Sequence, residues 1–407
     1  MDPRREAREV TGGTGPARPM KFGFLSEADP RPGQTYGQRY RDLFDEVILA
    51  EQLGFDIFGL SEQHFALGVA SVSAPECLFS YLFARTTHIR FRHAIMLLPY
   101  MINHPLRVAE RIATEDVLSN GRIELGVGRG NTTLTLRAFG VSPDENKDQS
   151  DEALDLIMIA LTQDPFRFEG KFFKVPPRSL VPKAVQFPHP PIWAAAMSPD
   201  SIQLAAGKGI GVWATASDRG WGYLERVVTQ YKASVAETAA SGKHVNNSCA
   251  VVTSAHCAET QAKALEESSA ALIDSRKLST DAYGKLAKIS KDYAYMQEIA
   301  DTVSQKGSDL DYMLNESASL IIGSPEDFVK AIERYQRLGA DEVWFRLDSL
   351  PHEVLMRSIN LIGRHVIPRF KEPWSVVEDP EVLRARIRAS RAAGAAESTG
   401  PPPNMAP

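Results

Sequence analysis

Eight short apolar runs recur along the chain, and each is followed by a longer stretch with the 3.6-residue period of an amphipathic helix. The runs fall at residues 21–25, 56–60, 89–98, 122–128, 191–197, 209–215, 248–254 and 341–347. Parallel strands need a crossover connection, usually a helix, and such crossovers are right-handed. Eight strand–helix units in succession therefore predict an α/β fold, a closed (β/α)8 TIM barrel with insertions.

Two internal stretches interrupt this rhythm. Residues 164–190 alternate aromatic and polar side chains and are rich in proline, which predicts a hairpin and an extended loop over the top of the barrel. Residues 272–320 are polar and helical with no strand between them, which predicts an insertion that forms a lid over the active site. Residues 1–19 and 373–407 have the composition of flexible tails, so the barrel domain is expected at 20–372.

Charge and composition exclude several classes of protein. The net charge is −5 over 407 residues, whereas a protein that binds nucleic acid or an anionic membrane needs a basic face. No apolar run is long enough to span a bilayer, and the N-terminus lacks the apolar core of a signal peptide. Three scattered cysteines are typical of a reducing compartment, so a cytoplasmic protein is expected.

Reactive groups of a TIM barrel come from the segments that follow its strands. After the second strand come Glu62, Gln63 and His64, and a histidine there can exchange a proton near neutral pH. The alternative for this histidine is a packed or surface role. No set of histidine, cysteine and carboxylate residues has the spacing of metal ligands, so no metal site is expected.

Two further strand ends suit a phosphate group. The fourth strand runs into GVGRGN, where glycines allow close approach of a ligand and Arg129 offers a planar cationic fork. The fifth strand ends at MSPDS, where Ser198 is a good N-cap and free N–H groups would face an anion. Each segment alone is equally consistent with a tight turn or a capped helix. Together they would lie on adjacent loops and could hold one phosphate.

The sequence resembles the bacterial luciferase-like flavin monooxygenases over about residues 20–370. Five segments carry the resemblance, in the same order and spacing: MKFGFL, SEQHF, HPLRVAERIATEDVLSNGRIELGVGRGN, PPIWAAAMSPDSIQLAAGKGIGVWA and IIGSPEDFVKAIERYQRLGADEVWF. The resemblance implies an FMN site at the top of the barrel. The residues that it places around FMN are Ala94, Gly128, Arg129, Asn131, Ala196, Met197, Ser198 and Ser201.

In this family Ala94 would fall near a non-prolyl cis peptide beneath the flavin ring. Glu62, Gln63 and His64 would be the catalytic group, and Phe65, Arg92, His93 and Tyr100 are candidate neighbours of the substrate. Two departures from luciferase matter. Gln63 stands where luciferase has its histidine base, and Gly128 stands where it has a reactive cysteine. Glutamine cannot take a proton at neutral pH, so plain monooxygenation is expected rather than light emission.

The implied activity is that of an FMNH2-dependent monooxygenase. Dioxygen would be activated as a flavin C4a-peroxide and one oxygen atom transferred to a small organic substrate. A separate NAD(P)H:flavin reductase would supply FMNH2, because the sequence has no dinucleotide-binding fingerprint. Members of this family commonly pair through helices, here those after the second and third strands, so a homodimer is expected.

Three other functions remain open on the sequence. A related branch of the fold uses the deazaflavin F420 for hydride transfer without oxygen, although Arg129 and Asn131 follow the monooxygenase form of the loop. A non-catalytic flavin-binding protein would bind flavin without turnover. An unrelated phosphate-binding barrel enzyme would need a lysine or a carboxylate pair at the strand ends, and neither stands out.

Overall fold

Eight parallel strands close into a barrel in the computed structural model, which describes residues 19–67, 70–130, 132–196, 198–241 and 245–371. The strands are β1 (Lys21–Ser26), β2 (Ile57–Leu60), β3 (Arg90–Leu97), β4 (Ile123–Gly128), β7 (Ile192–Ala195), β8 (Gly211–Ala214), β9 (Cys249–Cys257) and β11 (Glu342–Arg346). Each pairs in parallel with the next, and β11 pairs with β1 to complete the ring. All eight strands coincide with the predicted runs, and the fold class is confirmed.

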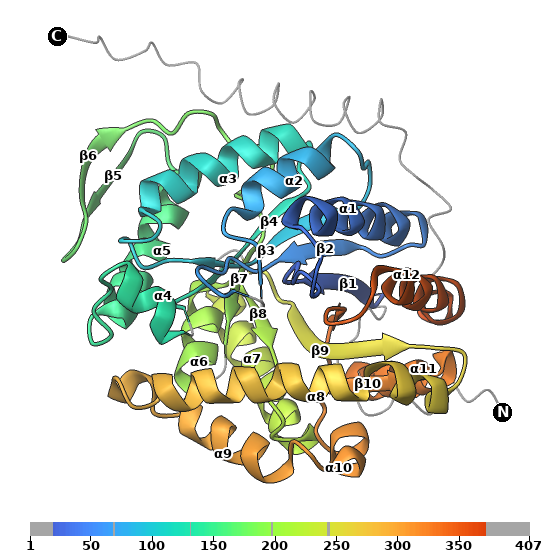
Figure 1. Cartoon of the computed structure of the whole chain (residues 1–407). Coiled ribbons are helices and arrows are strands. Elements are labelled where there is room, and N and C mark those ends of the chain that lie inside the picture. The colour runs from blue at the N-terminus through green and yellow to red at the C-terminus, as the bar shows by residue number, and fades with distance from the viewer. Residues whose placement is uncertain (1–18, 68–69, 131, 197, 242–244, 372–407) are drawn as a thin grey trace.

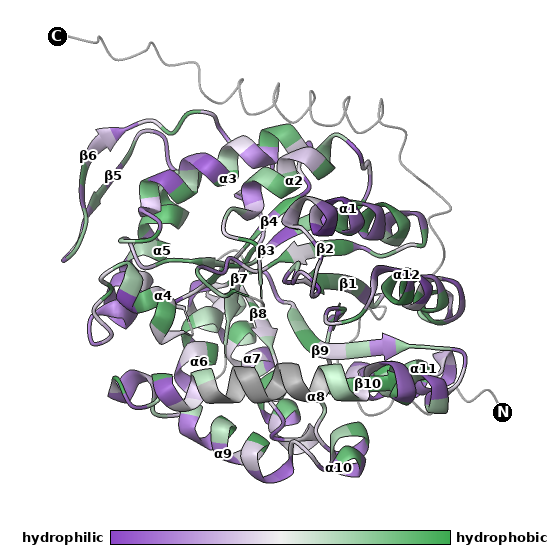
Figure 2. Ribbon diagram, in the orientation of Figure 1, coloured by the Kyte–Doolittle hydropathy of each residue, from purple (hydrophilic) through white to green (hydrophobic). Residues whose placement is uncertain are grey.

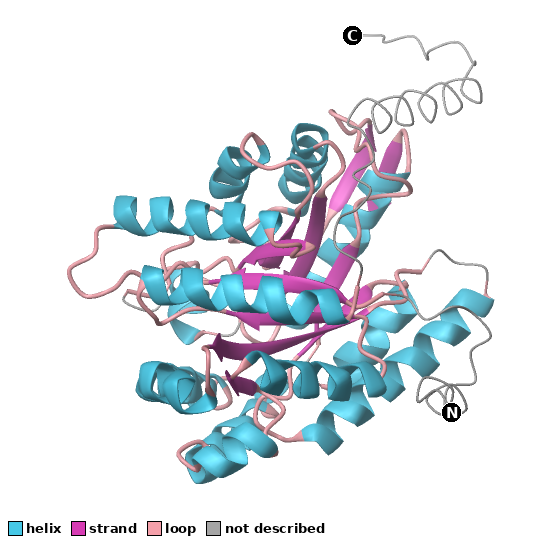
Figure 3. Cartoon of the chain, turned by 90° about the vertical axis from the view of Figure 1, so that its right-hand side faces the viewer, coloured by secondary structure: helices cyan, strands magenta, loops and turns pink. Residues whose placement is uncertain are grey.

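Helices surround the barrel, so that the strands lie in the middle of the molecule in both views (Figures 1 and 3). They are α1 (Tyr36–Gln52), α2 (Pro75–Phe83), α3 (Pro105–Ser119), α4 (Thr133–Ala138), α5 (Asn146–Thr162), α6 (Pro199–Lys208), α7 (Trp221–Ala240), α8 (Gln261–Leu286), α9 (Met296–Lys306), α10 (Leu310–Asn315), α11 (Pro325–Arg337) and α12 (His352–Leu361). Figure 2 shows both purple and green along α1 and α3, as expected for helices that bury one face. No helix among the described residues is long and apolar enough to cross a membrane.

Local sequence fixes where α11 begins and ends. The Ser324 hydroxyl accepts from the Asp327 N–H, and the Asp327 carboxylate accepts from the Ser324 N–H at 2.9 Å, which together form a capping box. Pro325 occupies the first helical position, where its missing N–H costs nothing. Gly339 follows the helix with a φ of +90°, a conformation that favours glycine. The predicted start and end of this helix are confirmed.

The hairpin predicted between residues 164 and 190 forms, but the interpretation that it lies over the barrel top is wrong. Strands β5 (Phe166–Glu169) and β6 (Lys174–Arg178) pack Phe166 and Phe173 against α3 and α5, on the outside of the barrel. The following loop runs along α3, where Asp116 accepts from the N–H groups of Val185 and Gln186 at 2.7 and 2.8 Å. Burial of these apolar side chains against the helices is more favourable than their exposure over the polar mouth of the barrel.

A ninth parallel strand, β10 (Leu320–Gly323), was missed at the end of the predicted insertion. It pairs with the end of β9, outside the closed ring. Its four apolar residues lie inside a long helical stretch, where a short apolar run cannot be told from a buried helix segment by its period. The rest of the insertion is helical, as predicted, with α8, the turn Lys291–Tyr293, α9 and α10. Its role as a lid stays a prediction.

Candidate active site

Side chains that point into the barrel alternate with those that face the helices, because successive residues of a strand point to opposite sides. On β1, Phe22 and Phe24 pack outward in the main core, whereas Leu25 belongs to a separate inner cluster with Trp193 and Trp344. The same alternation can be followed past the strand ends to the mouth of the barrel. It defines which residues of each strand can face a ligand.

Beneath the mouth, a closed layer of charged and aromatic side chains fills the barrel. Arg92 of β3 is fully buried, and its Nη2 lies 2.6 Å from Glu124 Oε2 and 2.9 Å from Glu342 Oε2. Its guanidinium carbon lies 3.6 Å from the ring centroid of Trp193 and 4.6 Å from that of Trp344. Arg92 therefore belongs to the layer that forms the floor of the barrel mouth. It is not the substrate neighbour that the sequence suggested.

His93 lies on the other face of β3. Its Nε2 is 2.9 Å from Glu115 Oε2 on α3, and its ring packs edge-on against Phe79 of α2. The suggestion that His93 borders the substrate is therefore wrong, because neighbouring residues of a strand point to opposite sides. Tyr100 and Phe65 are exposed, at 40% and 61%.

Above this floor, one side of the barrel is lined by small residues. A β-carbon added to Gly128 would lie 1.9 Å from Ile95 Cδ1, and one added to Gly126 would lie 2.2 Å from the His93 carbonyl oxygen. Ala94 adds only a methyl group, and the Ala94–Ile95 peptide bond is cis, as the resemblance implied. The wall formed by β3 and β4 is thus flat and closely packed, and it has no room for larger side chains.

The segment after β2 is anchored by Glu62. This buried carboxylate accepts from the Leu97 N–H at 2.9 Å and from Asn103 Nδ2 at 2.9 and 3.0 Å. Its Oε1 also lies 2.9 Å from His64 Nε2. If Nε2 carries the hydrogen for that bond, Nδ1 of His64 is the acceptor nitrogen. Glu62 therefore orients the His64 ring and, in this tautomer, leaves Nδ1 as a hydrogen-bond acceptor.

His64 and Gln63 differ in how firmly they are held. The His64 ring packs edge-on against Phe139 at 5.0 Å, and the His64 carbonyl accepts from the Thr135 hydroxyl at 3.3 Å. Gln63 is fixed through its main chain, whose N–H donates to the Val72 carbonyl at 2.8 Å. No hydrogen bond of its amide side chain occurs within the part of the chain that the structure describes.

Arg129 follows β4 and is surrounded by residues from distant parts of the chain. Asn146 of α5 donates to the Arg129 carbonyl at 2.9 Å, and the guanidinium lies 5.2 Å from the ring centroid of Tyr293. Even so, Nη1 of Arg129 is buried without a hydrogen-bond partner among the described residues. Burial raises the pKa of Tyr293 and of Tyr295, while Arg129 opposes this shift.

Ser198 lies on the neighbouring loop, since β4 and β7 pair with Val127 opposite Ala194. It caps α6: the Ser198 hydroxyl accepts from the Ser201 N–H at 3.3 Å, and the Ser201 hydroxyl accepts from the Ser198 N–H at 3.1 Å. The predicted cap is confirmed, and it places the amino end of α6 beside the loop that carries Arg129. The Ala196 N–H is used within the barrel, where it donates to Trp213 at 3.2 Å.

Asn131 and Met197 lie outside the described residues. The structure brings the other predicted residues to the same end of the barrel. Glu62, Gln63 and His64 follow β2, Arg129, Ala196, Ser198 and Ser201 follow β4 and β7, and Ala94 and Gly128 lie on β3 and β4 between them. Sequence reasoning missed Tyr293 and Tyr295. The only signal for them was their position in the insertion that was predicted to approach the site.

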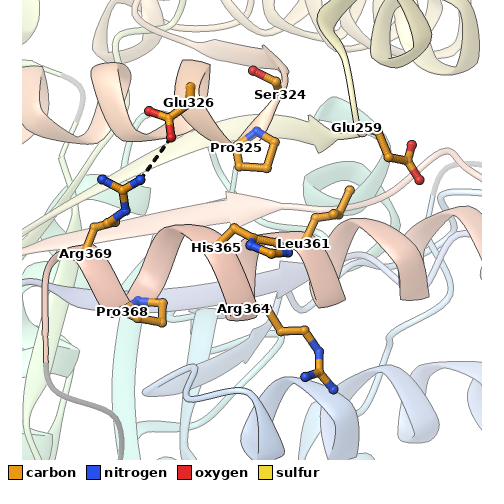
Figure 4. A pocket seen from close by; sticks show the side chains of 9 residues that line it. All are labelled: Glu259, Ser324, Pro325, Glu326, Leu361, Arg364, His365, Pro368 and Arg369. Carbon is orange, nitrogen blue, oxygen red and sulfur yellow. Dashed lines mark hydrogen bonds and ion pairs between the residues drawn. The ribbon is translucent and has the colours of Figure 1, made fainter.

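A cavity of about 620 Å³ lies elsewhere. It is lined by Glu259, Ser324, Pro325, Glu326, Leu361, Arg364, His365, Pro368 and Arg369. Figure 4 shows Arg369 reaching Glu326, with Nη2 3.0 Å from Oε1. The cavity is built by α11 and the segment after α12, and none of the predicted site residues lines it.

The chain belongs to the luciferase-like monooxygenase family, because residues 20–342 match that family. It is 26% identical to 4-hydroxyprotoasukamycin monooxygenase of Streptomyces nodosus subsp. asukaensis over 370 residues, which are 86% of this chain and 92% of that protein. Two uncharacterized proteins of Sinorhizobium fredii are 34% and 32% identical over 47% and 48% of this chain. The chain spans only about half the length of these two relatives, 55% and 56%.

Solved structures share the fold. Monooxygenase RslO1 from Streptomyces bottropensis superposes with a TM-score of 0.71 at 22% identity, covering 86% of this chain and all of that one. The coenzyme F420 dependent tetrahydromethanopterin reductase from Methanopyrus kandleri superposes with a TM-score of 0.63 at 20% identity, covering 87% and 99%. At such low identity these superpositions show only that the barrel fold is shared. The cofactor has to be inferred from the residues of the site.

Proposed function

We propose that this protein is an FMNH2-dependent monooxygenase that transfers one atom of dioxygen to a small organic substrate. The observation that carries the proposal is the buried, unpartnered Nη1 of Arg129. A buried cationic donor without an acceptor is costly unless an anion completes it. Arginine matches a phosphate group in geometry, and the amino end of α6 lies on the adjacent loop.

The wall of small residues on β3 and β4 is a suitable surface for a planar ring attached to that phosphate. FMN would be held at its phosphate by Arg129 with Ser198 and Ser201, and its ring would lie against Ala94 and Gly128. Asn131, Ala196 and Met197 are proposed neighbours on the same loops. The bound flavin supplies the activation of dioxygen, which protein side chains alone do not provide.

His64 is proposed to hold or move a proton at Nδ1 beside the reacting group. Its Nε2 is fixed 2.9 Å from Glu62, whose other contacts are to Leu97 and Asn103, so Glu62 acts as a positioning residue. Gln63 can donate or accept a hydrogen bond but cannot take up a proton. The proposed division of roles is proton transfer by His64 and orientation of substrate or dioxygen by Gln63.

The proposed assembly has two further partners. A separate NAD(P)H:flavin reductase would deliver FMNH2, and a second copy of the chain would pack on α2 and α3. Tyr81 on α2 is 46% exposed and Leu118 on α3 is 60% exposed, which leaves apolar surface on both helices. The proposed working unit is the domain 20–372 in the cytoplasm, with residues 272–320 as a lid.

The test is an anaerobic titration of the protein with FMNH2 and, in parallel, with reduced F420, followed by rapid mixing with oxygen. Binding of FMNH2 and an oxygen-dependent absorbance change seen only with FMNH2 would support the monooxygenase. Binding of F420 without reaction with oxygen would move the chain to the hydride-transfer branch of the fold. Flavin binding without oxygen uptake in a substrate screen would indicate a non-catalytic flavin-binding protein.

A further inference from the structure

A second buried polar group lies at the mouth, three strands away from Arg129. Glu27 comes two residues after Leu25, so it continues the inward-facing positions of β1. It is only 7% exposed, and its Oε2 is buried without a hydrogen-bond partner among the described residues. Ser61, after β2, occupies the matching inward position beside it. Neither residue was identified from the sequence.

The hydrogen bonds of Ser61 indicate which form of Glu27 is present. The Ser61 oxygen lies 2.7 Å from the Ala94 carbonyl oxygen and 3.1 Å from Glu27 Oε1. A serine hydroxyl has one hydrogen, and the Ala94 carbonyl can only accept. Ser61 can therefore give its hydrogen to only one of these two oxygens at a time. If the hydrogen goes to the shorter contact, the contact with Glu27 is a hydrogen bond only when Oε1 carries a proton, which favours a neutral carboxylic acid at Glu27.

The charges around Glu27 agree with this assignment. Arg346 is the nearest cation, with Nη2 3.9 Å from Glu27, but its Nε lies closer to Asp348, at 3.2 Å. Asp348 also accepts from the Glu27 N–H at 3.0 Å. Asp29, which faces the same cluster, has its own partner in Arg31 at 2.6 Å. Two carboxyl groups thus share one guanidinium. Burial raises the pKa of both, that of Asp348 to about 7, but Asp348 has the closer contact with Arg346, and Glu27 is the one with an unpartnered oxygen.

The helix that packs behind this cluster contributes one cation, Arg39, which is paired with a carboxylate of its own helix. Arg39 of α1 lies 3.4 Å from the Ser26 hydroxyl, but both of its terminal nitrogens are held by Glu46 at 2.9 and 3.0 Å. Burial raises the pKa of Glu27 and Asp29 adds to this shift, while Arg346 opposes it, as does the Ser61 hydroxyl in the arrangement in which it donates to an ionised Glu27. A raised pKa is expected for a carboxyl group that keeps its proton.

We propose that Glu27 is a positioning residue, a neutral acid that fixes Ser61 against the Ala94 carbonyl and thereby shapes the wall for the flavin ring. The positioning role rests on the proposed function. Ionised Glu27 would draw the Ser61 hydrogen to itself and leave the Ala94 carbonyl without a donor. It would also place a negative charge beside reduced flavin, which is itself an anion, and would weaken its binding.

The experiment compares the wild-type protein with Glu27→Gln and with a matched control, Glu115→Gln. Glu115 is also a buried glutamate with one unpartnered oxygen, but it pairs with His93 outside the barrel. Infrared spectra of the protein without flavin should show the C=O stretch of a protonated carboxyl group. Because the pKa of Asp348 is also raised, to about 7, the spectra are compared above that pH, where we expect Glu27→Gln to remove a component of this band and Glu115→Gln to retain it.

Anaerobic FMNH2 binding measured against pH then tests the positioning role. Above the pKa of Glu27 the wild-type affinity should fall by up to about tenfold for each pH unit, because binding favours the protonated acid. Glu27→Gln, which is always neutral, should bind with nearly constant affinity over the same range. Ser61→Ala should keep the infrared band and bind FMNH2 more weakly at every pH.

Two results would overturn the inference. One is a wild-type spectrum without the carboxylic acid band, or a band unchanged by Glu27→Gln. The other is a pH dependence of FMNH2 affinity that is the same in the wild type and in Glu27→Gln. If no variant bound flavin at any pH, the proposed function and the positioning role would fail together. The infrared band would then still decide whether Glu27 is a neutral acid.

Discussion

Replacing Arg129 by alanine should weaken FMN binding far more than riboflavin binding. The side chain has a buried Nη1 with no partner in the described residues, so this donor is available to an incoming phosphate. A hydrogen bond to a charged group contributes about 1.5–3 kcal/mol, and a paired arginine–phosphate contact lies near the upper end. A loss of about 3 kcal/mol corresponds to an affinity roughly 100-fold lower.

Riboflavin lacks the phosphate, so its affinity should change little in Arg129→Ala. The assay is quenching of flavin fluorescence on titration with FMN and with riboflavin. Arg129→Lys keeps the charge but loses the planar fork, and we expect an intermediate loss of about tenfold. Arg137→Ala, at an exposed position on α4, is the matched control and should bind both flavins as the wild type does. An equal loss for the two flavins would refute the assignment, because Arg129 would then act through the fold of its loop.

Three other substitutions test the packing and the charges. Gly128→Ala would put a β-carbon 1.9 Å from a side-chain carbon on β3, so flavin affinity should fall and stability should drop by about 1–3 kcal/mol. Gly207→Ala, which has open space around it in α6, should leave flavin affinity unchanged and raise stability by about 0.5–1 kcal/mol in denaturant titrations. Arg92→Met removes the cation that Glu124 and Glu342 share, which leaves Glu124 paired with Arg90 and Glu342 with only a 4.0 Å contact to Lys21. It should lower the free energy of unfolding by about 3–5 kcal/mol in urea titrations, and an unchanged midpoint would contradict this. The hydrogen bond to Glu46 raises the pKa of His352 above its unfolded value of about 6.5, so this stabilisation is fully present below that pH and is lost as pH rises through the folded pKa. The difference in urea midpoint between wild type and His352→Gln should therefore be large in acid and disappear in alkali.

Local patterns predicted much of this molecule because they report on short-range physics. The apolar runs gave all eight barrel strands, since a strand buried on both faces must be apolar along its length. Ser198 and Ser324 were recognised as caps because capping depends on residues three positions apart. Arg129 and Ser198 were assigned to adjacent loops from strand order alone, and the pairing of β4 with β7 agrees.

Other features depend on contacts between residues far apart in the chain. Arg92 and His93 are adjacent and both polar, yet one fills the barrel and the other packs against α3, because a strand alternates its faces. The hairpin was recognised as a hairpin, but its apolar residues could be buried against several surfaces, and only the packed helices show which one.

The sequence by itself determined the barrel, the order of its strands and the segments that surround its mouth, because strand period, caps and turns are encoded within a few residues. Only the tertiary structure decided which polar side chains there have partners. The unpartnered atoms of Arg129 and Glu27 depend on residues from separate strands and helices. Whether a buried donor or acceptor is satisfied is a property of three-dimensional packing, which no local pattern of residues records.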